Sequence, residues 1–142
     1  SGEAQGIAHI WNVVNIDGRW SYIDVTFDDT AFDSDGAVFY AYCNVPEEYL
    51  VKSHIFADNQ TLFPTTGYEY FYYTRKGNAV FSKEDFRQIV YLPISEGATR
   101  VEAFILIKEI QPLLDTLKNL NKSMQLSYFE INECTLLDVT VQ

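Results

Sequence analysis

The chain has 142 residues, 47% of them apolar, which is enough to bury the core of one domain. Its formal net charge of −10 repels phosphate backbones and anionic membrane surfaces, so we expect neither nucleic acid nor a membrane as a partner. No apolar run reaches the roughly 18 residues of a membrane helix, and residues 1–6 lack the basic and apolar regions of a signal peptide. We expect a single folded domain over residues 1–142.

An Asp-Gly pair at residues 17–18 separates two segments, 8–16 and 19–27, in which apolar and polar residues alternate. This pattern predicts a β-hairpin with a two-residue turn. The turn fixes which residues face each other across the hairpin: Ile16 and Arg19, Trp11 and Asp24, His9 and Thr26. A three-residue turn would instead send Asp24 to the opposite face.

The acidic stretch at residues 28–36 has short polar side chains that favour turns, and it predicts a loop. Its similarity to a calcium-binding loop is only partial. With Gly36 as the central glycine, the first and last ligand positions would be Ala31 and Tyr42, neither of which supplies a carboxylate. An ordinary acidic turn is therefore the preferred interpretation.

The remaining segments predict alternating helices and strands. Residues 37–43 suit a buried strand or a short helix, and Pro46-Glu47-Glu48 suits the first turn of a helix. The later elements are a strand at 67–74 with a turn at 75–78, a helix capped by Ser82 that ends near Pro93, a strand at 100–107, a helix at 112–121, and strands at 125–131 and 135–141. Together they predict an α+β fold, an antiparallel sheet with packed helices.

In the predicted hairpin register, His9 and Asp24 are diagonal neighbours on one face. Diagonal cross-strand positions lie about 7 Å apart, which allows an imidazole and a carboxylate to form a hydrogen bond. A carboxylate placed in this way orients the imidazole and leaves its other nitrogen free to deprotonate a nucleophile. Trp11, Trp20 and Tyr22 share this face, and we expect them to line the site and restrict water.

The segment around these residues resembles the bacterial transglutaminase-like superfamily. His9-Ile10-Trp11-Asn12, the Gly18-Arg19-Trp20 turn exit and Asp24-Val25-Thr26-Phe27-Asp28-Asp29 are similar to the family's His-Ala-Trp-Asn, Gly-x-Trp and Asp-x-Thr-Trp-Asp-Asp blocks. The similarity is dense over these twenty-one residues and looser over the next sixty, where Lys52-Ser53-His54 resembles a downstream portion of such domains. Ile10 and Phe27 depart from the family pattern, each with another apolar residue.

The resemblance implies that the chain is the C-terminal portion of a transglutaminase-like domain of the papain-like fold. His9 and Asp24 would be catalytic residues of a Cys-His-Asp triad that cleaves or transfers amides through a thioester. In the family the cysteine opens a helix upstream of the histidine strand, but no cysteine stands among the eight residues before His9. We therefore expect a cysteine peptidase or acyl-transfer enzyme as the parent protein, and this chain alone to be inactive.

Two other interpretations remain open. In the first, the fold is degenerate and serves as a non-catalytic binding or structural module. In the second, a separate chain supplies the cysteine. Self-association through the face left by the missing upstream half would indicate the last of these. By resemblance to bacterial members that are secreted or surface-bound, we expect an extracellular or cell-surface protein with a protein or peptide substrate.

The other reactive side chains suit structural roles. Cys43 lies in an apolar, aromatic segment where burial would raise its pKa, and Cys134 is expected to be a surface or half-buried structural residue. His54 and Asp58 would be one helical turn apart, but no further metal ligands accompany them, so we expect a solvated pair, no metal site and no cofactor. The tyrosines at 68, 70 and 72 are expected to pack across strands.

Overall fold

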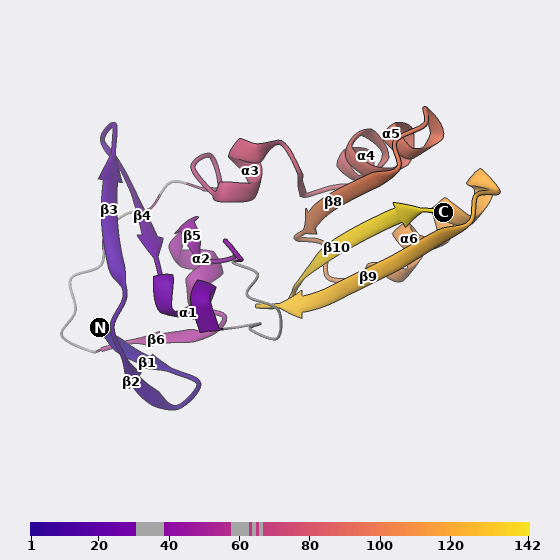
Figure 1. The fold of residues 1–142 in the computed structure, drawn as a ribbon. Helices are drawn as coiled ribbons and strands as arrows, with labels where there is room; N and C mark the ends of the chain where they lie inside the picture. The colour runs from indigo at the N-terminus through magenta and orange to yellow at the C-terminus, as the bar shows by residue number, and fades with distance from the viewer. Residues whose placement is uncertain (31–38, 58–62, 64, 66) are drawn as a thin grey trace. The chain divides into compact units, whose positions relative to one another are not determined.

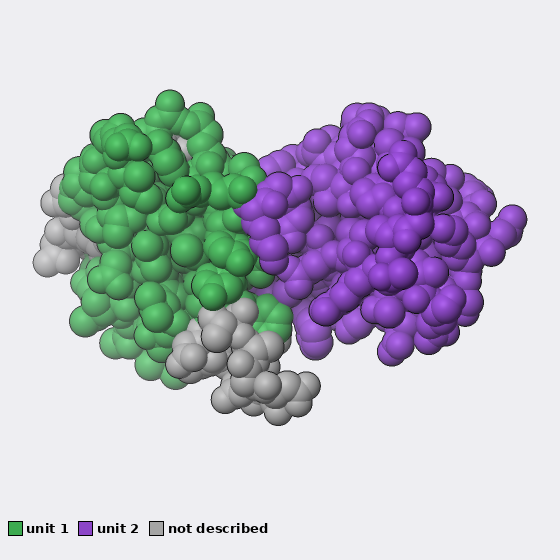
Figure 2. Space-filling view, turned by 45° about the horizontal axis from the view of Figure 1, so that its top comes forward, with its two compact units in different colours: residues 1–75 green, residues 76–142 purple. Residues whose placement is uncertain are grey.

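The protein is described by a computed structural model, which defines the placement of residues 1–30, 39–57, 63, 65 and 67–142. The described residues form an α+β protein, as the sequence predicts, and most of their strand pairs are antiparallel. The chain divides into two compact units, Ser1–Arg75 and Lys76–Gln142 (Figure 2). The expected single domain over residues 1–142 stays a prediction.

Unit 1 contains two small sheets (Figure 1). One has the strand order β2-β1-β6, with β1 (Gly2–Ala4) between β2 (Ile7–His9) and β6 (His54–Phe56). The other has the order β3-β4-β5, formed by β3 (Asn12–Ile16), β4 (Arg19–Ile23) and β5 (Cys43–Val45). His9 and His54 thus belong to the two outer strands of the same three-stranded sheet.

The β3–β4 hairpin has the predicted register. Ile16 pairs with Arg19 and Asn12 with Ile23 across the turn. Asp17 and Gly18 both have positive φ, 51° and 81°, which the mirror-image hairpin turn requires and which Asp-Gly adopts easily.

The hairpin is shorter than predicted at both ends. The first segment breaks after His9, which belongs to β2 and pairs with Gly2, so His9 is not opposite Thr26. The second segment ends at Ile23, and helix α1 (Val25–Thr30) replaces the predicted strand end. The reason is a cap: the Asp24 carboxylate accepts a hydrogen bond from the Phe27 amide at 3.1 Å, which satisfies a donor of the first helical turn.

The aromatic segment after residue 67 is not the predicted strand. Residues 67–70 form a turn and α3 (Tyr72–Lys76) follows, with Gly77 at φ 82° ending the helix. Phe71 and Tyr73 are buried in the aromatic core of unit 1 and contact each other at 5.6 Å between ring centroids. Tertiary packing has overridden the β-propensity of these residues.

The aromatic core of unit 1 is completed by α2 (Glu47–Leu50), which begins after Pro46 as predicted. Its Tyr49 is fully buried and lies 5.7 Å from Phe71 and 5.8 Å from Tyr42 between ring centroids. This helix therefore connects the aromatic side chains of the turn region with those that precede β5.

Unit 2 contains one sheet with the order β7-β8-β10-β9. Its strands are β7 (Ala79–Val80), β8 (Arg100–Ile105), β9 (Met124–Ile131) and β10 (Cys134–Val141). The β7–β8 pair is parallel, and the others are antiparallel. The last three strands lie close to their predicted positions.

Helices complete unit 2. The first begins at the predicted cap, Ser82, and runs through α4 (Lys83–Phe86), the π-helical turn η1 (Arg87–Tyr91) and α5 (Leu92–Ser95). The irregular turn precedes Pro93, which has no amide hydrogen to donate and would clash with the carbonyl four residues earlier in a regular helix. The second is α6 (Gln111–Leu117), followed by the 3-10 turn η2 (Lys118–Leu120).

The main hydrophobic cluster of unit 2 is largely aliphatic. It comprises Val80, Phe86, Val90, Ile94, Ala103, Ile105, Leu113, Leu114, Leu117, Leu137 and Val139. The helical leucines predicted to share one face are thus in the core, with Leu120 partly buried at its margin. None of the helices in the described residues is long and apolar enough to cross a membrane.

Candidate functional site

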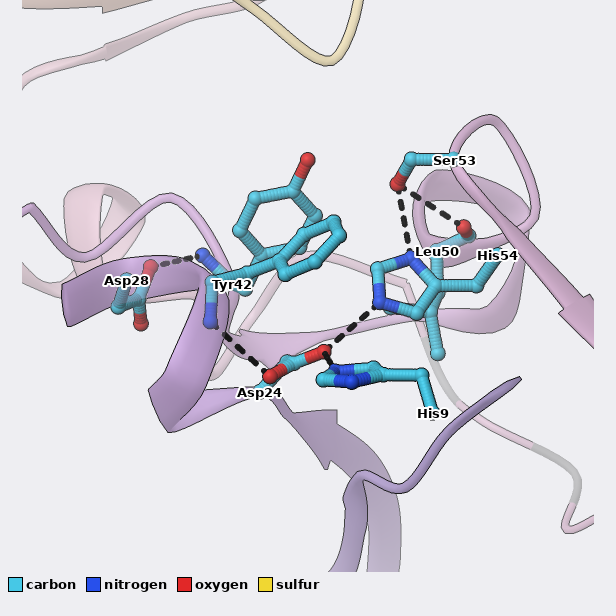
Figure 3. A network of polar contacts seen from close by, with 8 residues as sticks. His9, Asp24, Asp28, Tyr42, Leu50, Ser53 and His54 are labelled. Atoms are coloured by element: carbon cyan, nitrogen blue, oxygen red, sulfur yellow. Dashed lines mark hydrogen bonds and ion pairs between the residues drawn. The ribbon is translucent and has the colours of Figure 1, made fainter. Parts of the chain in front are cut away.

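The candidate site of unit 1 is built around the carboxylate of Asp24. This residue follows β4 and caps α1, and its side chain is only 1% exposed. Its Oδ2 atom lies 2.6 Å from Nε2 of His9 and 2.8 Å from Nε2 of His54. One carboxylate oxygen thus holds both histidines of the chain, as Figure 3 shows.

The two histidines differ in exposure and in their other contacts. His54 is fully buried, and its Nδ1 lies 2.8 Å from the hydroxyl of Ser53. The side chain of His9 is 17% exposed, and its Nδ1 makes no hydrogen bond with a described residue. His9 is therefore the member of the cluster that solvent or a substrate can reach.

Aromatic rings enclose the cluster. Trp11 packs edge-on against His54, with ring centroids 5.0 Å apart, and lies 6.2 Å from His9. Phe27 lies 5.1 Å from His9 and 4.7 Å from His54. A shallow depression lined by Ser1, Gly2, Ala8, His9, Ile10, Thr26 and Ala57 opens on the accessible side of His9.

The environment of Asp24 favours its ionised form. Burial by itself raises the pKa of Asp24, but hydrogen bonds from His54, the Phe27 amide and His9, together with the charge of His9, outweigh it and hold the pKa below its ordinary value. The carboxylate is therefore an acceptor at neutral pH, and each Nε2 that bears a proton can donate to it.

Asp28, one turn further along α1, behaves in the opposite way. Burial raises its pKa to about 7, and the charge of Asp24 adds to this, whereas backbone amides of Tyr42 and Ala41 oppose it. The Asp28 carboxyl accepts a hydrogen bond from the Tyr42 amide at 2.7 Å. This second carboxyl thus fixes the segment that leads into β5.

The structure brings together only some of the residues predicted for the site. His9, Asp24 and Trp11 lie in the cluster. Tyr22 is fully buried behind it, in contact with Phe56, which in turn packs on Trp11. Trp20 packs on Phe63 at 4.4 Å, and among the described residues it has no ring contact with His9.

His54 is the residue that sequence reasoning missed as a partner of Asp24. Its expected partner Asp58 lies outside the described residues, and so does most of the acidic stretch compared with a calcium loop. The expectation of a solvated His54 is wrong, because β6 pairs with β1 and carries the side chain into the interior. The sequence drew attention to His54 through the Lys52-Ser53-His54 similarity and through its spacing to Asp58, and neither signal pointed to Asp24.

Neither cysteine has the properties of an activated nucleophile. Burial raises the pKa of the Cys43 thiol, the nearby charge of Asp28 adds to this, and Arg75 only partly offsets it. Cys134 is fully buried in β10, paired with Ile131, so the expected surface or half-buried position is wrong. A thiol that works with His9 would have to come from elsewhere.

The chain was also compared with known proteins. No family model matches it, and no curated protein sequence matches it.

Proposed function

We propose that this chain supplies the histidine and aspartate of a transglutaminase-like thiol enzyme, as the C-terminal portion of its domain. The observation that carries the proposal is the hydrogen bond of 2.6 Å between Nε2 of His9 and the buried carboxylate of Asp24. The resemblance of the segments around both residues to the family's histidine and aspartate blocks supports it.

The geometry suits His9 for acid–base work. Asp24 binds Nε2, so Nδ1 is the nitrogen left to take a proton from a thiol. The thiolate then attacks the carbonyl carbon of an amide. As the C–N bond breaks, His9 returns the proton to the leaving amine, and a thioester remains. Water or an amine next attacks the thioester carbonyl and gives a proton to His9, and the C–S bond breaks to return the thiol with that proton. The reaction is therefore a hydrolysis or an acyl transfer.

In this proposal the thiol comes from sequence outside these 142 residues. Ile10, which lines the His9 depression, is 77% exposed, and Ile7 and Val25, which adjoin lining residues in sequence, are 70% and 61% exposed. These exposed apolar side chains support a covering segment. The missing upstream half, a separate chain or self-association through this face would each cover them. By resemblance, the substrate is a protein or peptide, and the protein is extracellular or cell-surface.

The second candidate is a non-catalytic binding or structural module on a degenerate fold of the same kind. The observation that favours it is the state of the two cysteines, one with a raised pKa and the other fully buried. In that case the His9–Asp24 pair would be retained only for its contribution to stability.

Iodoacetamide labelling of the complete protein from its natural source separates the two candidates. We expect the intact mass of that protein to exceed the mass of this chain, and the reagent to label rapidly a cysteine outside it. In a recombinant His9→Gln variant the labelling should be at least about tenfold slower, because the base is lost. An exposed substitution in the same unit, Arg19→Gln, should leave the rate unchanged. Slow labelling of Cys43 or Cys134 alone, indifferent to His9→Gln, would establish the non-catalytic module instead.

A further inference from the structure

The arrangement of His9, Asp24 and His54 goes beyond what a thiol enzyme's acid–base pair requires. Two imidazole nitrogens and one carboxylate oxygen converge on one point, and all three lie within 4.8 Å of one another. A single histidine would suffice to work with a thiol. We propose that these three side chains form a binding site for a divalent transition-metal ion of the zinc class.

The distances are close to those of a metal site. Zinc binds histidine nitrogen and carboxylate oxygen at about 2.0–2.2 Å, so the ligand atoms of a tetrahedral ion lie about 3.4 Å apart. The two nitrogens now lie 2.6 and 2.8 Å from the Asp24 oxygen. Binding an ion therefore requires each nitrogen–oxygen separation to widen by less than about 1 Å.

The surrounding contacts hold the ligands in orientation. The hydroxyl of Ser53 lies 2.8 Å from Nδ1 of His54 and can accept its proton, which leaves the Nε2 lone pair to face Asp24. The Phe27 amide binds the other oxygen of Asp24, so Oδ2 is the oxygen that faces both histidines. Such outer contacts are the usual means by which proteins fix metal ligands.

The chemistry and the access favour zinc or a similar ion. Imidazole and carboxylate ligands suit zinc, nickel and iron, whereas calcium and magnesium prefer oxygen ligands alone. Three protein ligands leave a fourth position, and the depression beside the partly exposed His9 provides a route for the ion and for water. His54 and Asp24 form the buried side of the site.

The ion would compete with the role proposed for His9, a consequence that rests on the proposed function. A metal bound at Nε2 leaves the proton of the neutral ring on Nδ1, so His9 can no longer accept a proton from a thiol. Zinc would then hold a thiol enzyme in an inactive form. The metal site itself does not depend on the presence of a thiol.

Because the chain contains only two histidines, zinc binding can be followed at both of them by long-range ¹H–¹⁵N spectra of the imidazole rings. We expect one zinc ion per chain in calorimetric titration, and Nε2 of His9 and of His54 to shift together in the same titration. Absence of saturable binding, or a shift confined to one ring or to neither, would overturn the proposal and leave hydrogen bonds alone holding the cluster.

Two matched variants in α1 and its cap test the carboxylate. Asp24→Asn keeps an oxygen that can accept a hydrogen bond from the Phe27 amide, but it removes the anionic ligand. It should weaken zinc binding more than about 100-fold, because the loss of a contact that only orients a ligand already costs about 10- to 100-fold in affinity. Asp28→Asn is the control, a nearby buried carboxyl outside the cluster, and should change affinity less than about threefold. Equal effects of both substitutions would overturn the proposal. The wild-type spectra decide the matter if Asp24→Asn fails to fold.

These results are separable from the proposed function. Zinc binding without a reactive external cysteine would leave the metal site standing and remove the thiol enzyme. The reverse outcome would remove only the metal site.

Discussion

The two units bury different kinds of side chain. Unit 2 has a mainly aliphatic core and strands of up to eight residues, β9 and β10. Unit 1 has strands of three to five residues and an aromatic core, and it buries Asp24, Asp28 and His54. Among the described residues, all the buried ionisable side chains of Asp, Glu, His, Lys and Arg type lie in unit 1.

This difference indicates where each unit derives its stability. Aliphatic burial in unit 2 is non-directional and nearly independent of pH. Unit 1 depends in addition on hydrogen bonds to charged groups, which require one geometry and one protonation state. We therefore expect substitutions in the core to act on unit 2 at any pH, and pH itself to act on unit 1.

The largest effect is expected from Leu137→Ala in unit 2. Leu137 is fully buried in β10, between β8 and β9, and its truncation leaves a cavity in the core. The free energy of unfolding should fall by about 2–5 kcal/mol, to the same extent at acidic and neutral pH. Urea unfolding followed by far-UV circular dichroism measures it. A loss below about 0.5 kcal/mol would contradict the assignment of Leu137 to the core.

The next effect is a pH dependence that Asp28 confers on unit 1. The pKa of Asp28 rises from 3.8 to about 7 on folding, so the folded state holds the proton more tightly than the unfolded state. Its contribution to stability is full below about pH 3.8 and is lost as pH rises through 7. A difference of three pKa units corresponds to up to about 4 kcal/mol, an order-of-magnitude figure.

Asp28→Asn should remove this dependence, because asparagine cannot titrate but still accepts from the Tyr42 amide. The measurement is urea unfolding of wild type and variant at about pH 4.5 and about pH 8, where only the difference between the two proteins matters. Asp17→Asn, at an exposed turn position, is the control. If wild type and Asp28→Asn lose equal stability over this range, the carboxyl of Asp28 is not the source.

The same contrast explains how much of the fold the sequence could predict. In unit 2 the apolar period of the helix around Leu113 and Leu117 and the cap at Ser82 are local signals, and the corresponding helices form where expected. In unit 1 the Asp-Gly turn predicts the β3–β4 register for the same reason. Local sequence patterns thus predict the position and register of these elements, in which one face packs against a single core.

The errors fall where contacts distant in sequence decide. The pairing of Gly2 with Phe56, which brings His54 to Asp24, leaves no local periodic pattern. Asp24 stands in an alternating segment that favours a strand, yet its carboxylate caps a helix and binds both histidines. The sequence therefore predicted the His9–Asp24 contact, although from a hairpin that was longer than the real one. It did not predict that the buried His54 is the second partner of Asp24.

The smallest effect is expected at Ser82, which tests the local signals on which the prediction of unit 2 depended. Its hydroxyl accepts a hydrogen bond from the Asp85 amide at 3.1 Å, and the Asp85 carboxylate accepts one from the Phe81 amide. Ser82→Ala removes the first of these and should cost about 1 kcal/mol of unfolding free energy, measured by urea unfolding.

Ser95→Ala is the matched control for Ser82→Ala, because Ser95 is an exposed serine at the other end of the same helical run and donates only to the Leu92 carbonyl. It should cost less than about 0.5 kcal/mol, as most surface substitutions do. Equal losses for the two variants would mean that the start of this helix is fixed by burial of Phe86 and Val90, and that the cap predicted its position without stabilising it.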